Sequence, residues 1–281
     1  MLLLRDGLPP IIQHTFPILA VAGVPSSAPP PAESSFGALI YAFVLLFLLF
    51  LLINLDRRFR EYISRALIRP FNFFADIRDQ RLIPNAQTSM LAVVLSGALA
   101  GCLAALLRLV FSIPDLTRSF NLALPSSVAS QLQSLSKDYL AMLAILTGVA
   151  LGSILLLTLV LRFAAIFVRG RILLGDTYNV AVWALLPAAF LLPYDLIVPR
   201  MDINSATATI SYVTLLVLFL WSFYRLLKGT GVLFDVYPTK IYLYGTAVLL
   251  VVSAVLYFYL RHNHVFENFS FVSSVLRAVA A

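Results

Sequence analysis

Six long apolar stretches, separated by short polar segments, dominate the pattern along the chain. A helix needs about 20 apolar residues to cross the hydrocarbon layer of a membrane. Six stretches reach this length, at residues 36–55, 88–112, 139–161 (extending to about 168), 178–198, 208–227 and 240–260. None of them shows the alternation of apolar and polar residues that is typical of a barrel strand. The sequence therefore predicts an all-α fold, a polytopic transmembrane helical bundle with six spans.

The composition agrees with an integral membrane protein. Of the 281 residues, 61% are hydrophobic and 12% are charged, and the mean hydropathy is +0.94. Soluble domains have about a quarter of their residues charged. The single cysteine, Cys102, excludes an internal disulfide and any metal site built from several cysteines.

The basic residues are distributed unevenly between the predicted loops. Seven of the 20 lie in the segment 56–86: Arg57, Arg58, Arg60, Arg65, Arg69, Arg78 and Arg81. Three more follow the third span and three lie around the fifth loop: Arg162, Arg169, Arg171, Arg225, Lys228 and Lys240. The positive-inside rule places these loops in the cytoplasm and both termini outside it. We attribute the net charge of +7 to this topology and not to nucleic-acid binding.

The segment 56–86 also has an amphipathic pattern. Its apolar residues recur at helical spacing: Phe59, Tyr62, Ile63, Ala66, Leu67, Phe71 and Phe74. Such a helix can lie on an anionic membrane surface, held by Arg57, Arg65, Arg69, Phe71 and Phe74, or it can pack this stripe against the protein's own spans. Both alternatives stay open. Pro70 should end or kink the helix, and a second short helix can carry residues 71–82.

The predicted organisation has five parts. Residues 1–35 form an external Pro/Ser-rich tail with a signal-like segment, whose cleavage stays open, and residues 36–55 form the first transmembrane helix. Residues 56–86 are the cytoplasmic arginine-rich segment, residues 87–260 the five-span domain, and residues 261–281 an external tail. The longest external loop, 113–137, has the pattern of a short amphipathic helix.

Two features of the spans predict how they pack. Gly97 with Gly101, and Gly148 with Gly152, place small residues four apart in the second and third spans. Such spacing lets helix backbones approach closely, so we expect the two spans to share a glycine seam. In the fourth span, prolines recur every six residues, at Pro187, Pro193 and Pro199. Pro187 and Pro193 should kink the helix, and neighbouring helices must then satisfy the freed carbonyl groups.

The sequence offers few candidates for chemistry. Polar residues within the spans are Asp195, Asp176, Asn179 and Arg108, and we expect each to be hydrated or to snorkel to the interface because all lie near span ends. His262 and His264 have a spacing that can bind a metal, but a third ligand is not apparent, so we expect interfacial histidines. We find no catalytic triad and no phosphate-binding loop. The sequence therefore predicts no catalytic residue, no cofactor and no metal site.

From Arg69 onward the chain resembles the Yip family, five-span membrane proteins named for their interaction with Ypt/Rab GTPases, and in particular its bacterial branch. The similarity covers about residues 69–260. It rests on the segment RPFNFFADIRDQ, on the run WALLPAAFLLP in the fourth apolar block, and on the connection YRLLKGTGVLFDVYPTKIYLYG between the final two spans. The first span is an addition. The cytosolic Asp-Leu-Tyr-Gly-Pro-like segment of eukaryotic members is absent, so the resemblance does not imply Rab-type binding.

The resemblance implies a non-enzymatic membrane scaffold or adaptor that acts in membrane organisation or trafficking, in a bacterial inner membrane. Its expected partners are the lipid bilayer, through the anionic cytoplasmic leaflet, and another membrane protein or a second copy of the chain, with no nucleic acid. The alternative function is a small permease or transporter subunit that uses the proline-broken fourth span. A lipid-processing enzyme is a third hypothesis. A cavity under the prolines would favour the permease, and a solid bundle with an arginine-lined surface would favour the scaffold.

Overall fold

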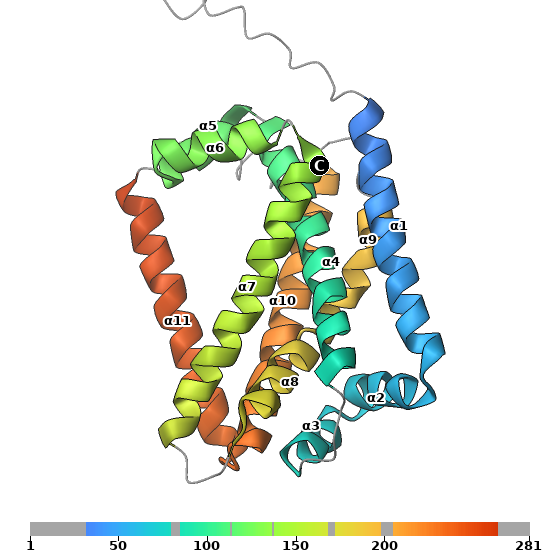
Figure 1. Ribbon diagram of the computed structural model, residues 1–281. Helices are drawn as coiled ribbons and strands as arrows, with labels where there is room; N and C mark the ends of the chain where they lie inside the picture. Colours follow the sequence, from blue (N-terminus) through green and yellow to red (C-terminus); the bar gives the residue numbers. More distant parts are fainter. Residues whose placement is uncertain are drawn as a thin grey trace, which may run out of the picture. The chain divides into compact units, whose positions relative to one another are not determined.

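The computed structural model describes residues 32–79, 85–112, 114–136, 138–167, 172–197 and 205–263 (Figure 1). All regular secondary structure in these ranges is helical. Almost all of the predicted N-terminal tail and most of the C-terminal tail lie outside the described residues. So do Arg81, Arg169, Arg171, Pro199 and His264.

The six predicted spans are confirmed as six helical segments long and apolar enough to cross a membrane. Five are continuous: α1 (Ala32–Leu55), α4 (Asn85–Ser112), α7 (Tyr139–Ala164), α10 (Ser205–Leu233) and α11 (Pro238–His262). The short 3₁₀ helix η2 (Ala165–Phe167) extends α7. The fourth span is broken into α8 (Leu174–Ala184), the 3₁₀ helix η3 (Leu186–Phe190) and α9 (Leu191–Ile197). The protein is therefore a multi-pass helical membrane protein.

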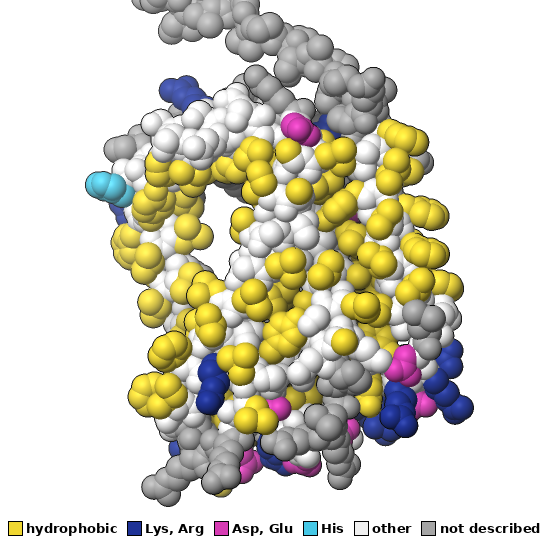
Figure 2. Space-filling model, in the orientation of Figure 1, with side chains coloured by type: hydrophobic (Ala, Val, Ile, Leu, Met, Phe, Trp, Pro, Cys, Tyr) yellow, Lys and Arg dark blue, Asp and Glu magenta, His cyan; other side chains and the backbone are white. Residues whose placement is uncertain are grey.

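Four short helices cover the two ends of the bundle. At one end lie α2 (Arg57–Ile68) and α3 (Pro70–Arg78), which Pro70 separates as predicted. At the other end lie α5 (Pro114–Ala123) and α6 (Ser126–Leu135), in the loop expected to hold one amphipathic helix (Figure 1). Dark-blue basic side chains gather at the α2–α3 end in the space-filling view (Figure 2). We call this the arginine-rich end.

The fourth span owes its break to Pro187. The proline has no N–H group to donate to the carbonyl oxygen of Trp183, so the α-helix ends at Ala184 and the chain continues as a 3₁₀ helix. The predicted kink at this position is a complete break. Pro193 behaves differently, because it lies in the first turn of α9, where the absence of an N–H group costs little.

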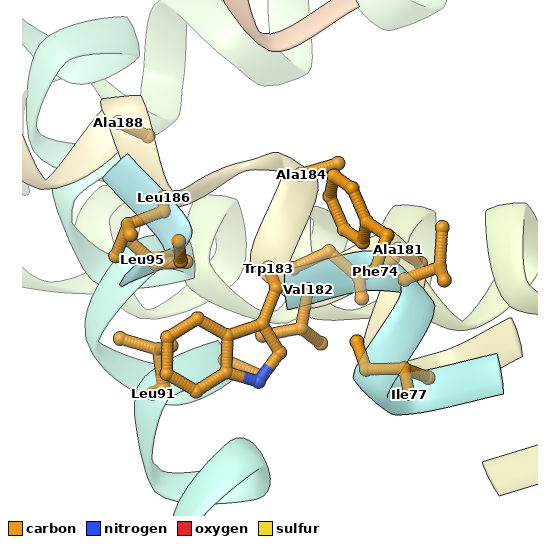
Figure 3. Close-up of a cluster of buried hydrophobic side chains, with 14 of the residues drawn as sticks. Phe74, Ile77, Leu91, Leu95, Ala181, Val182, Trp183, Ala184, Leu186 and Ala188 are labelled. Atoms are coloured by element: carbon orange, nitrogen blue, oxygen red, sulfur yellow. The ribbon is translucent and has the colours of Figure 1, made fainter. Parts of the chain in front are cut away.

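The main hydrophobic core lies towards the arginine-rich end, around α8. The side chain of Trp183 is fully buried, and its ring centroid lies 5.7 Å from that of Phe59 in α2 and 4.8 Å from that of Phe73 in α3. Phe74 and Ile77 of α3 and Leu91 and Leu95 of α4 belong to the same cluster (Figure 3). The short helices α2 and α3 are therefore part of the core and do not lie apart from the bundle.

Helix α11 is the least buried span. It packs against α10, where Leu227 fills the space beside Gly245 and the rings of Tyr224 and Tyr242 stack at 5.6 Å. None of its residues is buried. Near its other end, the hydroxyl of Tyr259 donates a hydrogen bond of 2.9 Å to the carbonyl oxygen of Ala123 in α5. The surface is hollowed between α11 and α7 (Figure 2).

The predicted glycine seam between the second and third spans is wrong. Although α4 and α7 are close neighbours, a Cβ atom on Gly148 or Gly152 would meet nothing within 4 Å, and both glycines are exposed. The glycines of α4 instead receive other segments. A Cβ atom on Gly97 would lie 2.6 Å from Leu45 of α1, and one on Gly101 would lie 2.5 Å from Asp195 of α9. The small residues of α4 thus make room for α1 and α9.

Candidate functional site

The helices α2 and α3 present a basic surface at the arginine-rich end. Six arginines on these helices and at the junction between them are exposed: Arg57, Arg58, Arg60, Arg65, Arg69 and Arg78. We call this set the arginine platform. Three of its members have acidic partners. Glu61 lies 3.5 Å from Arg57 and Asp76 lies 3.7 Å from Arg65, while Asp79 and Asp235 lie 3.2 Å and 3.4 Å from Arg78. Exposed ion pairs of this kind stabilise little, so the platform keeps most of its capacity to bind anions.

The apolar stripe of α2 and α3 packs mainly against the protein. Phe59, Ala66 and Phe74 are fully buried, and so is Phe73, which the predicted stripe did not include. The expectation that Phe74 contacts the membrane surface is therefore wrong. The exposed apolar side chains on these helices are Ile68 and Phe71, with 75% and 53% of their surface accessible. They flank the break between α2 and α3 and are the side chains there that can reach lipid.

An acidic residue joins the beginning of the platform to the bundle. Asp56 caps α2, since its Oδ1 accepts a 2.8 Å hydrogen bond from the backbone N–H of Arg58. Its other carboxylate oxygen accepts a 2.5 Å hydrogen bond from the side chain of Gln87 at the start of α4. The hydrogen bond from Arg58, and secondly that from Gln87, lower the pKa of Asp56 below its ordinary value. The first turn of α2 is thus tied to α4.

A buried arginine joins the end of α2 to the bundle. Arg225, in α10, is 1% exposed. Its Nη1 donates a hydrogen bond of 2.7 Å to the carbonyl oxygen of Ala66, and its Nη2 donates one of 3.0 Å to the carbonyl oxygen of Trp183. The distribution of basic residues predicts that Arg225 lies in a cytoplasmic loop. This prediction is wrong, because the guanidinium group lies inside the protein between α2, α8 and α10.

The two carbonyl groups that Arg225 binds share one property. In an α-helix each carbonyl accepts from the N–H group four residues later. For Ala66 that residue is Pro70, and for Trp183 it is Pro187, and neither proline has an N–H group. Arg225 therefore supplies, from a buried position, the donors that two prolines remove. This meets the expectation that a neighbouring helix satisfies the carbonyls freed in the fourth span.

A short buried hydrogen-bond chain connects α4 to α8 beside this site. The indole N–H of Trp183 donates to the hydroxyl oxygen of Thr88 at 3.3 Å, and that hydroxyl donates to Oδ1 of Asn179 at 2.7 Å. Thr88 is fully buried and Asn179 is 7% exposed. Asn179 is thus a satisfied structural residue and not a hydrated one.

A pocket of about 590 Å³ opens at the arginine-rich end between α3, α10 and α11. Its walls combine two basic side chains, Arg78 and Lys228, with aromatic rings that include Phe71, Tyr237 and Tyr242. One acidic residue, Asp235, also faces the pocket, 3.4 Å from Nη1 of Arg78. Basic pockets between transmembrane helices near the membrane surface are typical sites for anionic lipid headgroups.

The turn between α10 and α11 shapes the pocket. The N–H of Val236 donates to the carbonyl oxygen of Gly231 at 3.1 Å, and that of Asp235 donates to Val232 at 3.4 Å, which is the Schellman arrangement. Asp235 has a φ of 52°, the left-handed conformation in which this motif usually places glycine. Because an aspartate and not a glycine occupies this position, the carboxylate of Asp235 lies beside Arg78.

The remaining polar candidates have separate roles. Asp176 accepts a 2.9 Å hydrogen bond from the backbone N–H of Leu173 at the start of α8, and Arg108 lies 5.1 Å above the ring of Tyr139. Asp195 is 5% exposed, and neither of its carboxylate oxygens has a hydrogen-bond partner among the described residues. The expectation that Asp195 is hydrated is wrong. His262 is exposed, and the described residues contain no cluster of three potential metal ligands.

Comparison with known proteins adds no family assignment. No family model, no curated protein and no solved structure matches the chain.

Proposed function

We propose that the protein is a non-enzymatic membrane scaffold of the Yip-like kind, which binds the anionic cytoplasmic leaflet of a bacterial inner membrane through its arginine platform. One observation carries this proposal. The apolar faces of α2 and α3 pack mainly into the core. Hydrogen bonds from Gln87 to Asp56 and from Arg225 to Ala66 hold both ends of α2, so the bundle fixes the arginines on its outer surface. A surface that is ordered before binding loses little entropy when it binds lipid headgroups or an acidic partner.

The pocket beside the platform supports the same function. Arg78 and Lys228 offer charge for one phosphate-bearing headgroup, and Phe71 and Tyr242 offer apolar contact at the level where headgroup and acyl chain meet. Each arginine or lysine near an anionic leaflet contributes about 1 kcal/mol. The absence of burial on α11 leaves an apolar face beside the pocket for acyl chains or for the helix of a partner membrane protein.

The first test concerns orientation, because the proposal needs the platform in the cytoplasm. In a Cys102→Ala background, Arg65→Cys and Thr239→Cys should resist an impermeant maleimide applied to intact cells, while Ser127→Cys in α6 should react. All three positions are exposed, so access to the reagent depends on the side of the membrane. Labelling of Arg65→Cys from outside would contradict the proposal.

A permease is the second candidate function, and the unpartnered carboxyl of Asp195 on the broken fourth span favours it. The two functions differ in whether water reaches that span. Leu191 and Leu192 are at most 1% exposed. Leu191→Cys and Leu192→Cys should therefore stay unreactive towards small water-soluble thiol reagents if the protein is a scaffold, and reaction at either position would favour the permease.

A further inference from the structure

The carboxyl group of Asp195 occupies a space that only a glycine leaves open. A Cβ atom on Gly101 of α4 would lie 2.5 Å from Oδ2 and 2.8 Å from Cγ of Asp195, closer than real contacts allow. The two carboxyl oxygens are inaccessible to solvent and lack a hydrogen-bond partner within the part of the chain that the structure describes. The carboxyl group is therefore closely packed against Gly101, while its oxygens lack a hydrogen-bond partner among the described residues.

The position of Gly101 shows how deep the carboxyl group lies. The span in α4 ends at Arg108, seven residues further on. With a rise of 1.5 Å per residue, the carboxyl group lies about 10 Å along the helix from that end. One turn earlier, Gly97 faces Leu45 and Tyr41 of α1. Asp195 is the last residue of its own span, but its contact with Gly101 places the carboxyl group beside the interior of the α4 span.

No described side chain offers Asp195 a positive charge. The ionisable groups whose charge interacts with that of Asp195 are Tyr41 on α1, Cys102 on α4 and Tyr139 on α7, all of which are neutral when protonated. Arg108 contacts the ring of Tyr139 instead. An unpaired carboxylate in such surroundings costs many kcal/mol, and the group avoids this cost by binding a proton.

We propose that Asp195 is an intramembrane proton-binding site, whose carboxyl group carries a proton while α9 is packed on Gly101 and exchanges it when α9 moves away. The step is a simple protonation of a carboxylate, and it requires no other reactant. The seven-residue helix α9 is connected to α8 through the 3₁₀ segment η3, so it can move without breaking a continuous α-helix. This inference goes beyond the scaffold function, which needs no proton.

The experiment uses the full chain in proteoliposomes and the apolar reagent dicyclohexylcarbodiimide. A protonated carboxyl group adds across a C=N bond of this reagent and rearranges to a stable N-acylurea, with no leaving group. Peptide mass spectrometry should find the adduct on Asp195, with a rate that falls as the pH rises. A water-soluble carbodiimide should modify the exposed Glu61 instead and leave Asp195 unmodified.

Two variants sharpen the test. Asp195→Asn should lose the adduct and melt close to the parent protein, because an uncharged carboxamide replaces an uncharged carboxyl of the same shape. Gly101→Ala should displace the carboxyl group and change its modification rate by several-fold, while Gly148→Ala, which meets open space, should leave the rate unchanged.

Three results would overturn the proposal. The first is the absence of an adduct on Asp195 at every pH tested. The second is a saturable protection of Asp195 by sodium ions, which would indicate a cation site. The third is a large drop in the melting temperature of Asp195→Asn, which would indicate a charged carboxylate with an ionic partner. The orientation test above does not depend on any of these results, so the two proposals can fail separately.

Discussion

Arg225 donates a hydrogen bond of 3.0 Å to the carbonyl oxygen of Trp183, the carbonyl that Pro187 leaves without its usual helical donor. The same guanidinium group binds Ala66, which Pro70 leaves in the same state. One buried side chain thus compensates for two prolines in different parts of the chain. It also connects the platform helix α2 to the membrane bundle.

We expect the substitution Arg225→Met to destabilise the protein by at least about 2 kcal/mol, because hydrogen bonds from a charged donor contribute about 1.5–3 kcal/mol each and the carbonyls would be left unsatisfied. Denaturant unfolding in detergent measures this change. Arg225→Lys should be intermediate, because one ammonium group cannot reproduce the fork of the guanidinium. Arg118→Met, at an exposed position on α5, is the control and should shift stability by less than about 0.5 kcal/mol. Equal stability of the Met variants would refute the anchoring role of Arg225.

The sequence predicted the six spans and the separation of α2 from α3 because both depend on local rules, namely the length of apolar runs and the proline exclusion from helix interiors. It also predicted that a neighbour must satisfy the carbonyls freed by proline. It could not identify Arg225 as that neighbour, because the contact joins residues 159 and 42 positions apart in the chain. The available signal was an arginine within three residues of the end of a predicted span, which we assigned to the adjacent loop.

The glycine spacing was misleading for a related reason. Four-residue spacing shows that small residues share a helix face, but it does not show which neighbour that face meets. In α4 the face meets Leu45 and Asp195, whereas in α7 a Cβ atom on Gly148 or Gly152 would meet no described atom within 4 Å. The burial of Asp195 could not be predicted either. In a continuous helix the distance from the span end along the sequence indicates the depth of a residue, but in a broken span it does not.

The buried chain between Trp183, Thr88 and Asn179 leads to a second prediction. Thr88→Val keeps the shape of the side chain but removes the hydroxyl group, so the indole N–H and the amide oxygen both lose their partner. We expect a loss of about 1–3 kcal/mol in unfolding free energy. Thr88→Ser, which retains the hydroxyl, should recover most of this loss. If Val and Ser variants melt alike, the hydrogen bonds contribute nothing to stability.

Gly97 and Gly148 should respond in opposite directions to alanine. In α7, Gly148→Ala meets open space and should stabilise the helix by about 0.5–1 kcal/mol. In α4, Gly97→Ala forces Leu45 and Tyr41 to move, and overpacking typically costs about 1–3 kcal/mol. The melting temperatures of the two variants, measured in the same detergent, test this prediction. Equal shifts would mean that α1 does not pack on Gly97 as described.

The left-handed turn residue Asp235 leads to a fourth prediction. Asp235→Gly relieves the backbone at φ 52° and should leave stability equal or higher, while it removes one of the two carboxylates beside Arg78 and leaves Asp79. Asp235→Val places a β-branched side chain in the same conformation and should cost about 1–3 kcal/mol. Unfolding free energies compare the pair. A Val variant as stable as the Gly variant would show that the turn adopts a different conformation.

Binding of the arginine platform to the anionic leaflet can be measured as lipid selectivity by electron spin resonance. The protein is reconstituted, and the association of spin-labelled phosphatidylglycerol is compared with that of spin-labelled phosphatidylcholine. The test variant is Arg60→Glu/Arg69→Glu on the platform, and the matched control is Arg118→Glu/Arg261→Glu, which reverses two exposed arginines at the opposite end. Because each platform arginine contributes about 1 kcal/mol, the test variant should lose most of the preference for phosphatidylglycerol at low salt, whereas the control should keep it. An unchanged preference in the test variant, or an equal loss in the control, would show that the platform does not bind the anionic leaflet.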